Sequence, residues 1–167
     1  MARKIETLQA LYVEELRDLY NAENQLAKAM SEMAQAVQSD DLKEAFHTEA
    51  SEAQQHAQRI SQLCSSLKAD PAGHPCKGME GLLQEGRDLI QNGVQSPVLD
   101  AGLIATAQKA QHYEIAGYGC ASTFARILGR RDGETLLHQT MEEEKRADAS
   151  FTRVANRVIN VTAANSA

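Results

Sequence analysis

The sequence predicts an all-α protein folded as a four-helix bundle, and three observations support this prediction. The 167 residues are rich in Ala, Leu, Glu and Gln, which favour helices, and include only three Pro. Apolar residues recur at steps of three and four over four long segments. Aromatic residues make up only 4% of the chain, so the core must consist mainly of aliphatic side chains, many of them small. Such a core is typical of closely packed helices rather than of a sheet.

The first two long helices follow one another with a short connection. We expect the first from about Ile5 to Val37, where an apolar stripe repeats with helical spacing. The segment Ser39-Asp40-Asp41 breaks that stripe. The second helix is predicted to run to about Leu67, with Asp41 and Glu44 at the spacing of a capping box at its start.

The second half of the chain contains a shorter helix and two more long ones. The shorter helix is predicted from about Met79 to Gln91, after a loop with two prolines. The third long helix begins at Ser96-Pro97, a cap residue followed by proline, and ends at Leu128 before Gly129. The fourth is expected over about 134–160. We therefore predict one domain over residues 1–160 and a disordered tail over 161–167.

The lengths of the connections predict the topology of the bundle. The first and last connections are short, so each joins an antiparallel helix hairpin. The middle connection is about thirty residues long and carries the short extra helix. Two antiparallel hairpins joined by one long crossover form the connectivity of a ferritin-like four-helix bundle.

Several acidic residues lie on the apolar faces, where charged side chains are normally absent. Glu23, for example, follows Leu19 by four positions and precedes Leu26 by three. Each long helix has at least one such carboxylate near its midpoint, and the second and fourth have pairs one turn apart. The candidate inward-facing groups are Glu23, Glu49, Glu52, His56, Glu114, Glu144 and Asp148.

These acids predict a metal site in the centre of the bundle. An unpaired buried carboxylate costs several kcal/mol even after relaxation, so five or six cannot share one core without cations. Two divalent ions would supply the missing charge, and a mostly oxygen ligand set is typical of iron or manganese rather than zinc. The alternative is that these acids are solvated or paired with nearby basic residues, namely Lys28, Arg59, Lys109, Lys145 and Arg146.

Five segments of the chain resemble the YciE/YciF stress-protein family. They are Tyr20–Leu26, Ala45–His47, Met79–Leu82, His112–Gly119 and Glu142–Lys145, and the resemblance extends from about Ile5 to Val158. It implies a ferritin-like, dimeric protein induced under stress, with a di-iron site and no established reaction. Cys76, before Lys77-Gly78-Met79, also matches the family.

The resemblance implies Glu23, Glu52, Glu114 and Glu144 as metal ligands. Close relatives often have His where this chain has Glu49, whereas a histidine occurs here at His56. Either the nitrogen ligand has moved along the helix, or the site consists of oxygen ligands alone. Asp148 stands where better-known ferritin-like sites have His, which makes it the weaker ligand candidate.

Charge and hydropathy exclude other classes of protein. The net charge of −6 disfavours nucleic-acid binding, and the apolar runs are too short for a membrane span. No apolar signal region follows Met1, so a cytoplasmic location is expected. Cys64, Cys76 and Cys120 lack zinc-type spacing and are expected to be free thiols, and no catalytic triad or nucleotide-binding motif occurs.

Three functions remain open at this point. The first is a redox-active protein whose two iron ions react with oxygen or peroxide, which requires an open coordination position and turnover. The second is a non-enzymatic stress protein that acts by binding a partner and retains a structural or vestigial metal site. The third is a manganese-dependent peroxide dismutase. All three are compatible with a homodimer.

Overall fold

The computed structural model describes residues 5–166, and this part of the chain is helical without any strand. The described residues exclude 1–4 and 167. The expectation that no signal region is present, and part of the expected tail, concern these residues. The elements are α1 (Leu8–Ala36), α2 (Asp40–Ser66), α3 (Lys77–Asn92), α4 (Pro97–Ile127), α5 (Arg131–Val154), η1 (Ala155–Ile159, a π-helical turn) and α6 (Asn160–Ala164).

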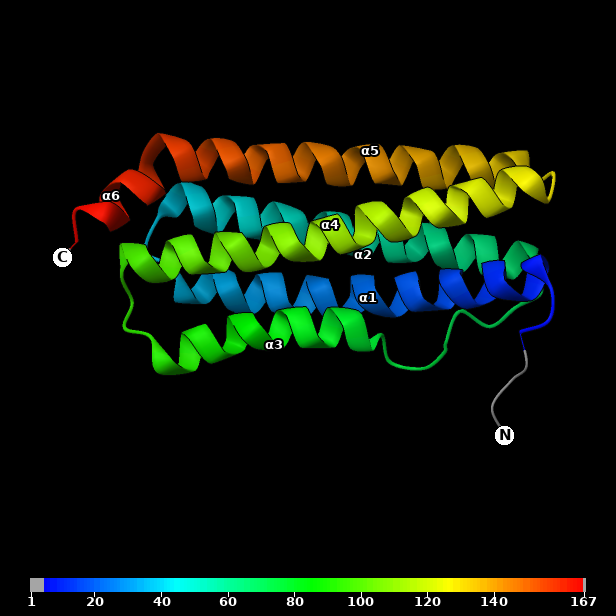
Figure 1. The fold of residues 1–167 in the computed structure, drawn as a ribbon, viewed down its shortest axis with the longest axis horizontal. Helices are drawn as coiled ribbons and strands as arrows, with labels where there is room; N and C mark the ends of the chain where they lie inside the picture. Colours follow the sequence, from blue (N-terminus) through cyan, green and yellow to red (C-terminus); the bar gives the residue numbers. More distant parts are fainter. Residues whose placement is uncertain (1–4, 167) are drawn as a thin grey trace.

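Four long helices run side by side along the longest dimension of the molecule (Figure 1). Helices α1 and α2 form one hairpin, and α4 and α5 form the other. The long crossover between the hairpins carries α3, which packs against α1 and α4 on the outside of the bundle. The predicted short helix in the long connection is therefore confirmed, and the described residues form an all-helical bundle of five principal helices.

Local signals explain where the helices begin, with one correction. The predicted capping box of Asp41 and Glu44 is wrong, because α2 begins earlier and Ser39 Oγ accepts the hydrogen bond from the Leu42 amide. Ser96 caps α4 in the predicted way, with Pro97 at the first helical position.

The end of the chain also differs from the expectation. Helix α5 begins at Arg131, three residues before the predicted start, without a side-chain cap. After Val154 the helix continues through the π-helical turn into α6 as far as Ala164, where an unstructured tail was expected from residue 161. Ala155 and Ile159 are buried against the core, which explains why the helix continues.

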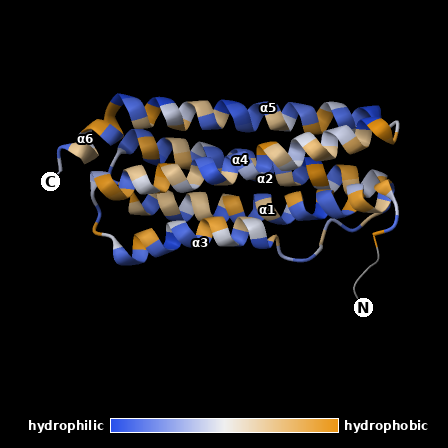
Figure 2. Ribbon diagram, in the orientation of Figure 1, coloured by the Kyte–Doolittle hydropathy of each residue, from blue (hydrophilic) through white to orange (hydrophobic). Residues whose placement is uncertain are grey.

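The apolar core consists of two separate clusters that share the same four helices. One cluster contains Leu26, Phe46, Leu103 and Phe151, together with Met79 of α3. The other contains residues of the opposite half of each long helix: Leu16, Ile60, Tyr118, Ala125 and Leu137. Every long helix thus passes from one apolar cluster to the other. Figure 2 shows hydrophilic residues, in blue, among the hydrophobic ones, in orange, in the middle stretches of the helices.

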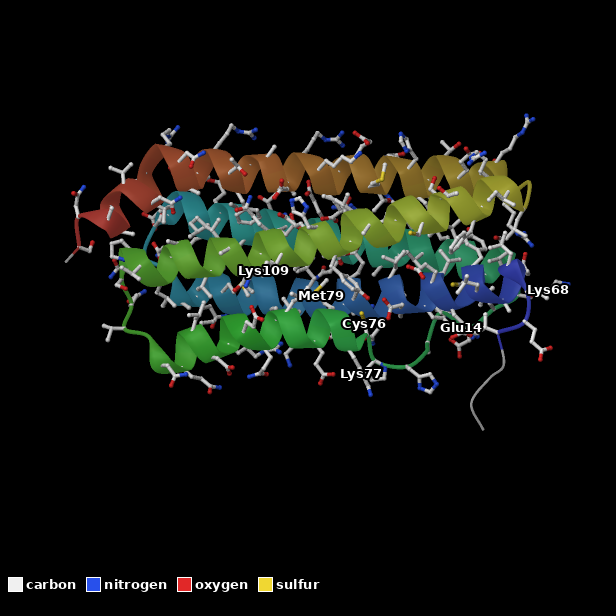
Figure 3. All side chains as sticks on the ribbon, in the orientation of Figure 1. Glu14, Lys68, Cys76, Lys77, Met79 and Lys109 are labelled. Atoms are coloured by element: carbon white, nitrogen blue, oxygen red, sulfur yellow. The ribbon has the colours of Figure 1, made fainter. Side chains whose placement is uncertain are left out.

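The start of α3 is held against the bundle by Cys76 and Met79, which lie beside α1 in Figure 3. The backbone amide of Cys76 donates to Asn21 Oδ1, and Gln25 donates to the Cys76 carbonyl. A Cβ at Gly78 would lie 2.7 Å from the ring of Tyr113 on α4, so the absence of a side chain there allows close packing.

Among residues 5–166, no helix is both long and apolar enough to cross a membrane. The three cysteines are free thiols; Cys64 and Cys76 are buried, and Cys120 is exposed.

Candidate metal centre

A layer of polar side chains separates the two apolar clusters. Glu23 of α1, Glu49 and His56 of α2, Glu114 of α4 and Glu144 of α5 are all at most 2% exposed. Four of them lie on their helices between residues of the two clusters, as Glu23 does between Leu19 and Leu26, whereas Glu49 lies one turn inside the first cluster, between Phe46 and Ala53. The predicted inward orientation of these five side chains is therefore confirmed.

Three of these residues form a compact group. His56 Nδ1 lies 2.9 Å from Glu144 Oε1 and 3.3 Å from Glu23 Oε1. One nitrogen or oxygen atom of each residue lies within 4.8 Å of those of the other two. Nδ1 therefore lies within contact distance of both carboxylates, although neither contact meets the geometry of a hydrogen bond.

The other edge of the His56 ring is held by Glu143. His56 Nε2 lies 3.0 Å from Glu143 Oε2, and Arg59 donates to the same carboxylate. Burial opposes ionisation of Glu143, but the hydrogen bonds from Arg59 and Gln139 outweigh it and lower the pKa of Glu143 to about 2. An ionised Glu143 favours a proton on Nε2, so Nδ1 is the ring atom that could bind a cation once its own proton is displaced.

Glu23 has a second fixed partner within the polar layer. The hydroxyl of the fully buried Tyr118 donates to Glu23 Oε1. The same hydroxyl therefore orients one carboxylate oxygen, whereas Glu23 Oε2 has no hydrogen-bond partner in the described part of the chain.

Glu49, Glu114 and Gln111 make up the other side of the polar layer. Gln111 is fully buried, and its amide meets the geometry of a hydrogen bond with none of the described residues, although it lies close enough to Glu49 to lower the pKa of that carboxyl group. Glu114 has two buried oxygens without partners, and Glu49 has one. Buried polar atoms are nearly always hydrogen-bonded, so this concentration of unpaired acceptors is unusual and indicates a ligand.

The crowded carboxylates alter one another's protonation. Burial, followed by the Glu23, Glu144 and Glu49 charges, raises the pKa of Glu114 well above its ordinary value. Burial also raises the pKa of Glu23 to about 7, although contacts with His56 and Tyr118 partly oppose this. In His56, burial lowers the pKa, but the Glu144 and Glu23 carboxylates outweigh burial and raise it to about 11. In the absence of a cation, protons must therefore balance this layer.

The alternative of pairing with nearby basic residues does not account for these acids. The cations proposed as partners contact other carboxylates: Lys28 with Glu32, Arg59 and Arg146 with Glu143, Lys109 with Glu85, and Lys145 with Glu142. His56 is the cationic partner that the structure places beside the buried carboxylates.

Two further ligand candidates lie at the margin of the layer. Glu52 is half-buried, yet close enough to raise the pKa of both Glu49 and Glu144. Asp148 accepts a hydrogen bond from Gln108 and lies 3.4 Å from His112, away from the compact group. The roles of Glu52 and Asp148 as ligands remain predictions.

Three residues of the centre were missed in the sequence, although spacing could have indicated two of them. Gln111 precedes Glu114 by three positions and Tyr118 follows it by four, which places all three on one face of α4. Glu143 could not have been found this way, because its role depends on how α5 packs beside α2.

Comparison with known proteins identifies the family of this chain. A family described as "Domain of unknown function (DUF892)" matches residues 7–164. The chain belongs to this family. It is also 39% identical over 166 residues to Protein YciF of Escherichia coli K12, covering 98% of this chain and 99% of YciF. The resemblance to the YciE/YciF stress proteins is confirmed.

Two solved structures resemble this DUF892 member closely. The crystal structure of the E. coli stress protein YciF matches with a TM-score of 0.89 and 38% identity, over 93% of this chain and 99% of that one. YcfI of Rhodopseudomonas palustris, provisionally described as a structural protein, matches with a TM-score of 0.86 and 33% identity, over 91% and 97% of the chains.

Proposed function

We propose that this DUF892 member is a ferritin-like stress protein whose buried carboxylate layer binds two iron ions and reacts with oxygen or peroxide. The observation that carries the proposal is the set of buried acceptor atoms without donors on Glu23, Glu49, Glu114 and Glu144. The arrangement of two helix hairpins with a long crossover supports the ferritin-like assignment.

Charge balance supports two divalent ions. Four buried carboxylates carry four negative charges when ionised, and two divalent cations carry four positive ones. His56 would then be neutral and could offer Nδ1 as a ligand, since Glu143 holds the opposite edge of its ring. Glu23, His56 and Glu144 would hold one ion, and Glu49 and Glu114, whose charges act on one another, would hold the second, with the Gln111 oxygen as a further neutral donor.

Residues around the centre would orient its ligands and keep bulk water away from it. Iron bound here would supply electrons to oxygen or peroxide. Tyr118 fixes the orientation of Glu23, and the two apolar clusters exclude bulk water from both sides. Mostly oxygen ligands also suit manganese, so manganese-dependent peroxide dismutation is a variant of the same proposal.

A second candidate is a non-enzymatic stress protein that binds a partner and retains the metal for stability. The description of the similar YcfI as a structural protein favours it. Both candidates are consistent with a cytoplasmic location and with a homodimer, and we propose the homodimer from the family resemblance.

Metal content and reactivity together test the proposal. The protein would be reconstituted with ferrous ion under argon and its iron measured by elemental analysis, beside Glu114→Gln and Glu144→Gln. The matched control is Glu142→Gln, because Glu142 is an exposed neighbour of Glu144 on the same helix. We expect about two irons per chain in the wild type and the control, and a loss of iron in the two buried variants.

Peroxide and oxygen consumption by the loaded protein would then separate the two candidates. Consumption that disappears in Glu114→Gln supports the redox function. Stoichiometric iron without any consumption supports the structural role instead. No iron bound by the wild type would refute the metal centre itself.

A further inference from the structure

A groove opens between the first half of α2 and the second half of α5. Its volume is about 1020 Å³, and it extends along the bundle from Ser39 and Asp41 to Glu52 and Glu143. On the α5 side its wall includes Ala147, Ser150 and Phe151 before it reaches η1.

The inner end of this groove reaches the polar layer. Glu49 lines the groove although it is only 2% exposed, and its Oε1 atom is buried without a hydrogen-bond partner among residues 5–166. The groove is therefore lined at one point by a residue of the polar layer that carries a buried, unpaired carboxylate oxygen.

Glu52 connects the groove with the buried acids. It lines the same groove one helical turn after Glu49 and is half-buried. It is close enough to Glu49 of α2 and Glu144 of α5 for its charge to raise the pKa of both carboxyl groups, while remaining partly exposed to solvent.

We propose that the groove between α2 and α5 is the route by which divalent cations reach the centre, and that Glu52 is the residue that passes them from the groove to Glu49. This inference rests on the proposed metal-binding function. In this inference, Glu52 contacts each cation only while the centre is being loaded.

The charges along the groove fit cations better than anions. Its lining includes five acidic residues and three arginines, Arg146, Arg153 and Arg157. Two of the arginines face acids: Arg157 lies 3.2 Å from Asp41, and Arg146 lies 4.0 Å from Glu143. At the inner end, Glu49 and Glu52 face the groove together. Acidic residues therefore outnumber arginines in the lining, and an excess of negative charge raises the local concentration of cations and their association rate.

Blocking the groove tests the route. Cobalt(II) would be mixed with the metal-free protein in a stopped-flow instrument, and its visible absorption would report the rate and the final amount of binding. Ala147→Phe fills the groove from α5, and Thr48→Trp fills it from α2. The matched control is Ala149→Phe, which adds the same ring to the same helix at an exposed position outside the groove lining.

We expect both blocking variants to load roughly tenfold or more slowly than the wild type, with the same final cobalt content, while Ala149→Phe loads at the wild-type rate. Glu52→Gln should also slow loading by several-fold without lowering the final content, whereas Glu142→Gln should not. Unchanged rates in both blocking variants would refute the route. A lower final content in Glu52→Gln at an unchanged rate would make Glu52 a permanent ligand and refute its transfer role.

The final cobalt content of the wild type separates this inference from the proposed function. A wild type that binds no cobalt contradicts the metal centre, and the route with it. Full and rapid loading of the wild type and both blocking variants contradicts the route alone.

Discussion

Glu143 and His56 form the contact that orients the candidate metal centre: Glu143 Oε2 lies 3.0 Å from His56 Nε2, on the ring edge opposite the atom that faces Glu23 and Glu144. Glu143 belongs to α5 and His56 to α2, so this contact also joins the two hairpins. Groups that fix a histidine ligand from behind determine its tautomer and its basicity.

Replacement of Glu143 should therefore weaken metal binding without removing a ligand. In Glu143→Gln, the His56 ring loses its ionised acceptor and its preference for a proton on Nε2. We expect the affinity for cobalt or ferrous ion to fall on the order of 10–100-fold at unchanged stoichiometry, measured by chelator competition. Wild-type affinity in Glu143→Gln would contradict the orienting role, and Glu142→Gln serves as the matched control.

The stability of the metal-free protein should depend on pH in a way that metal reverses. Burial, as the main cause, raises the pKa of Glu23 from 4.5 to about 7. A raised carboxyl pKa stabilises the folded state below the unfolded value and loses that contribution as the pH rises through the folded value. Glu23 alone should cost the metal-free protein roughly 3 kcal/mol between pH 4.5 and pH 8.

His56 also lowers the folding stability of the metal-free protein as the pH rises, but at higher pH than Glu23 does. The Glu144 and Glu23 carboxylates outweigh burial and raise its pKa from 6.5 to about 11, so its stabilisation fades as the pH rises through that range. Metal binding needs these groups deprotonated, so the loaded protein should gain stability with rising pH. Melting temperatures of both forms from pH 5 to pH 8 check this, and parallel slopes would contradict it.

Glu114→Gln should stabilise the metal-free protein while abolishing its response to metal. Glu114 is fully buried, and its two oxygens have no hydrogen-bond partner in the described chain. The amide removes a group that resists ionisation inside the bundle, so we expect a higher melting temperature without metal at pH 8. Added cobalt should raise the melting temperature of the wild type but not of this variant. A variant that melts lower than the wild type without metal would show that Glu114 has a structural partner.

Tyr118→Phe should destabilise the protein through Glu23. The tyrosine hydroxyl donates to a buried carboxylate, and loss of a hydrogen bond to a charged group costs roughly 1.5–3 kcal/mol. Chemical denaturation of the metal-free protein at pH 8 would measure this difference. Tyr20→Phe is the matched control, because Tyr20 is only partly buried and lies outside the polar layer. Equal losses in both variants would show that packing, rather than the hydrogen bond, is responsible.

Much of the fold was predictable because helix periodicity and connection length are local properties of the sequence. The inward positions of Glu23 and Glu114 followed from their spacing to neighbouring apolar residues. The start of α2 was misplaced because Ser39 and Asp41 are both acceptable cap residues. The choice between them depends on the preceding turn, where the Asp100 carboxylate accepts from the Ser39 amide across the bundle.

The details of the site depended on contacts between helices, which spacing does not determine. Periodicity placed Glu49, Glu52 and His56 on one side of α2 but could not decide which of them is buried. The structure buries Glu49 and His56 and leaves Glu52 at the groove. Asp148 follows Glu144 by one turn, yet Gln108 and His112 of α4 hold it at the edge of the layer.

The division of the core into two apolar clusters has a consequence for the lifetime of the protein. A polar layer between two apolar clusters would weaken the coupling between the two ends of the bundle, so that either end could open and expose backbone to proteases. Ions bound in that layer would join the ends into one cooperative unit. Because degradation follows the population of open forms, the steady-state amount of the protein would then report the supply of metal in the cell.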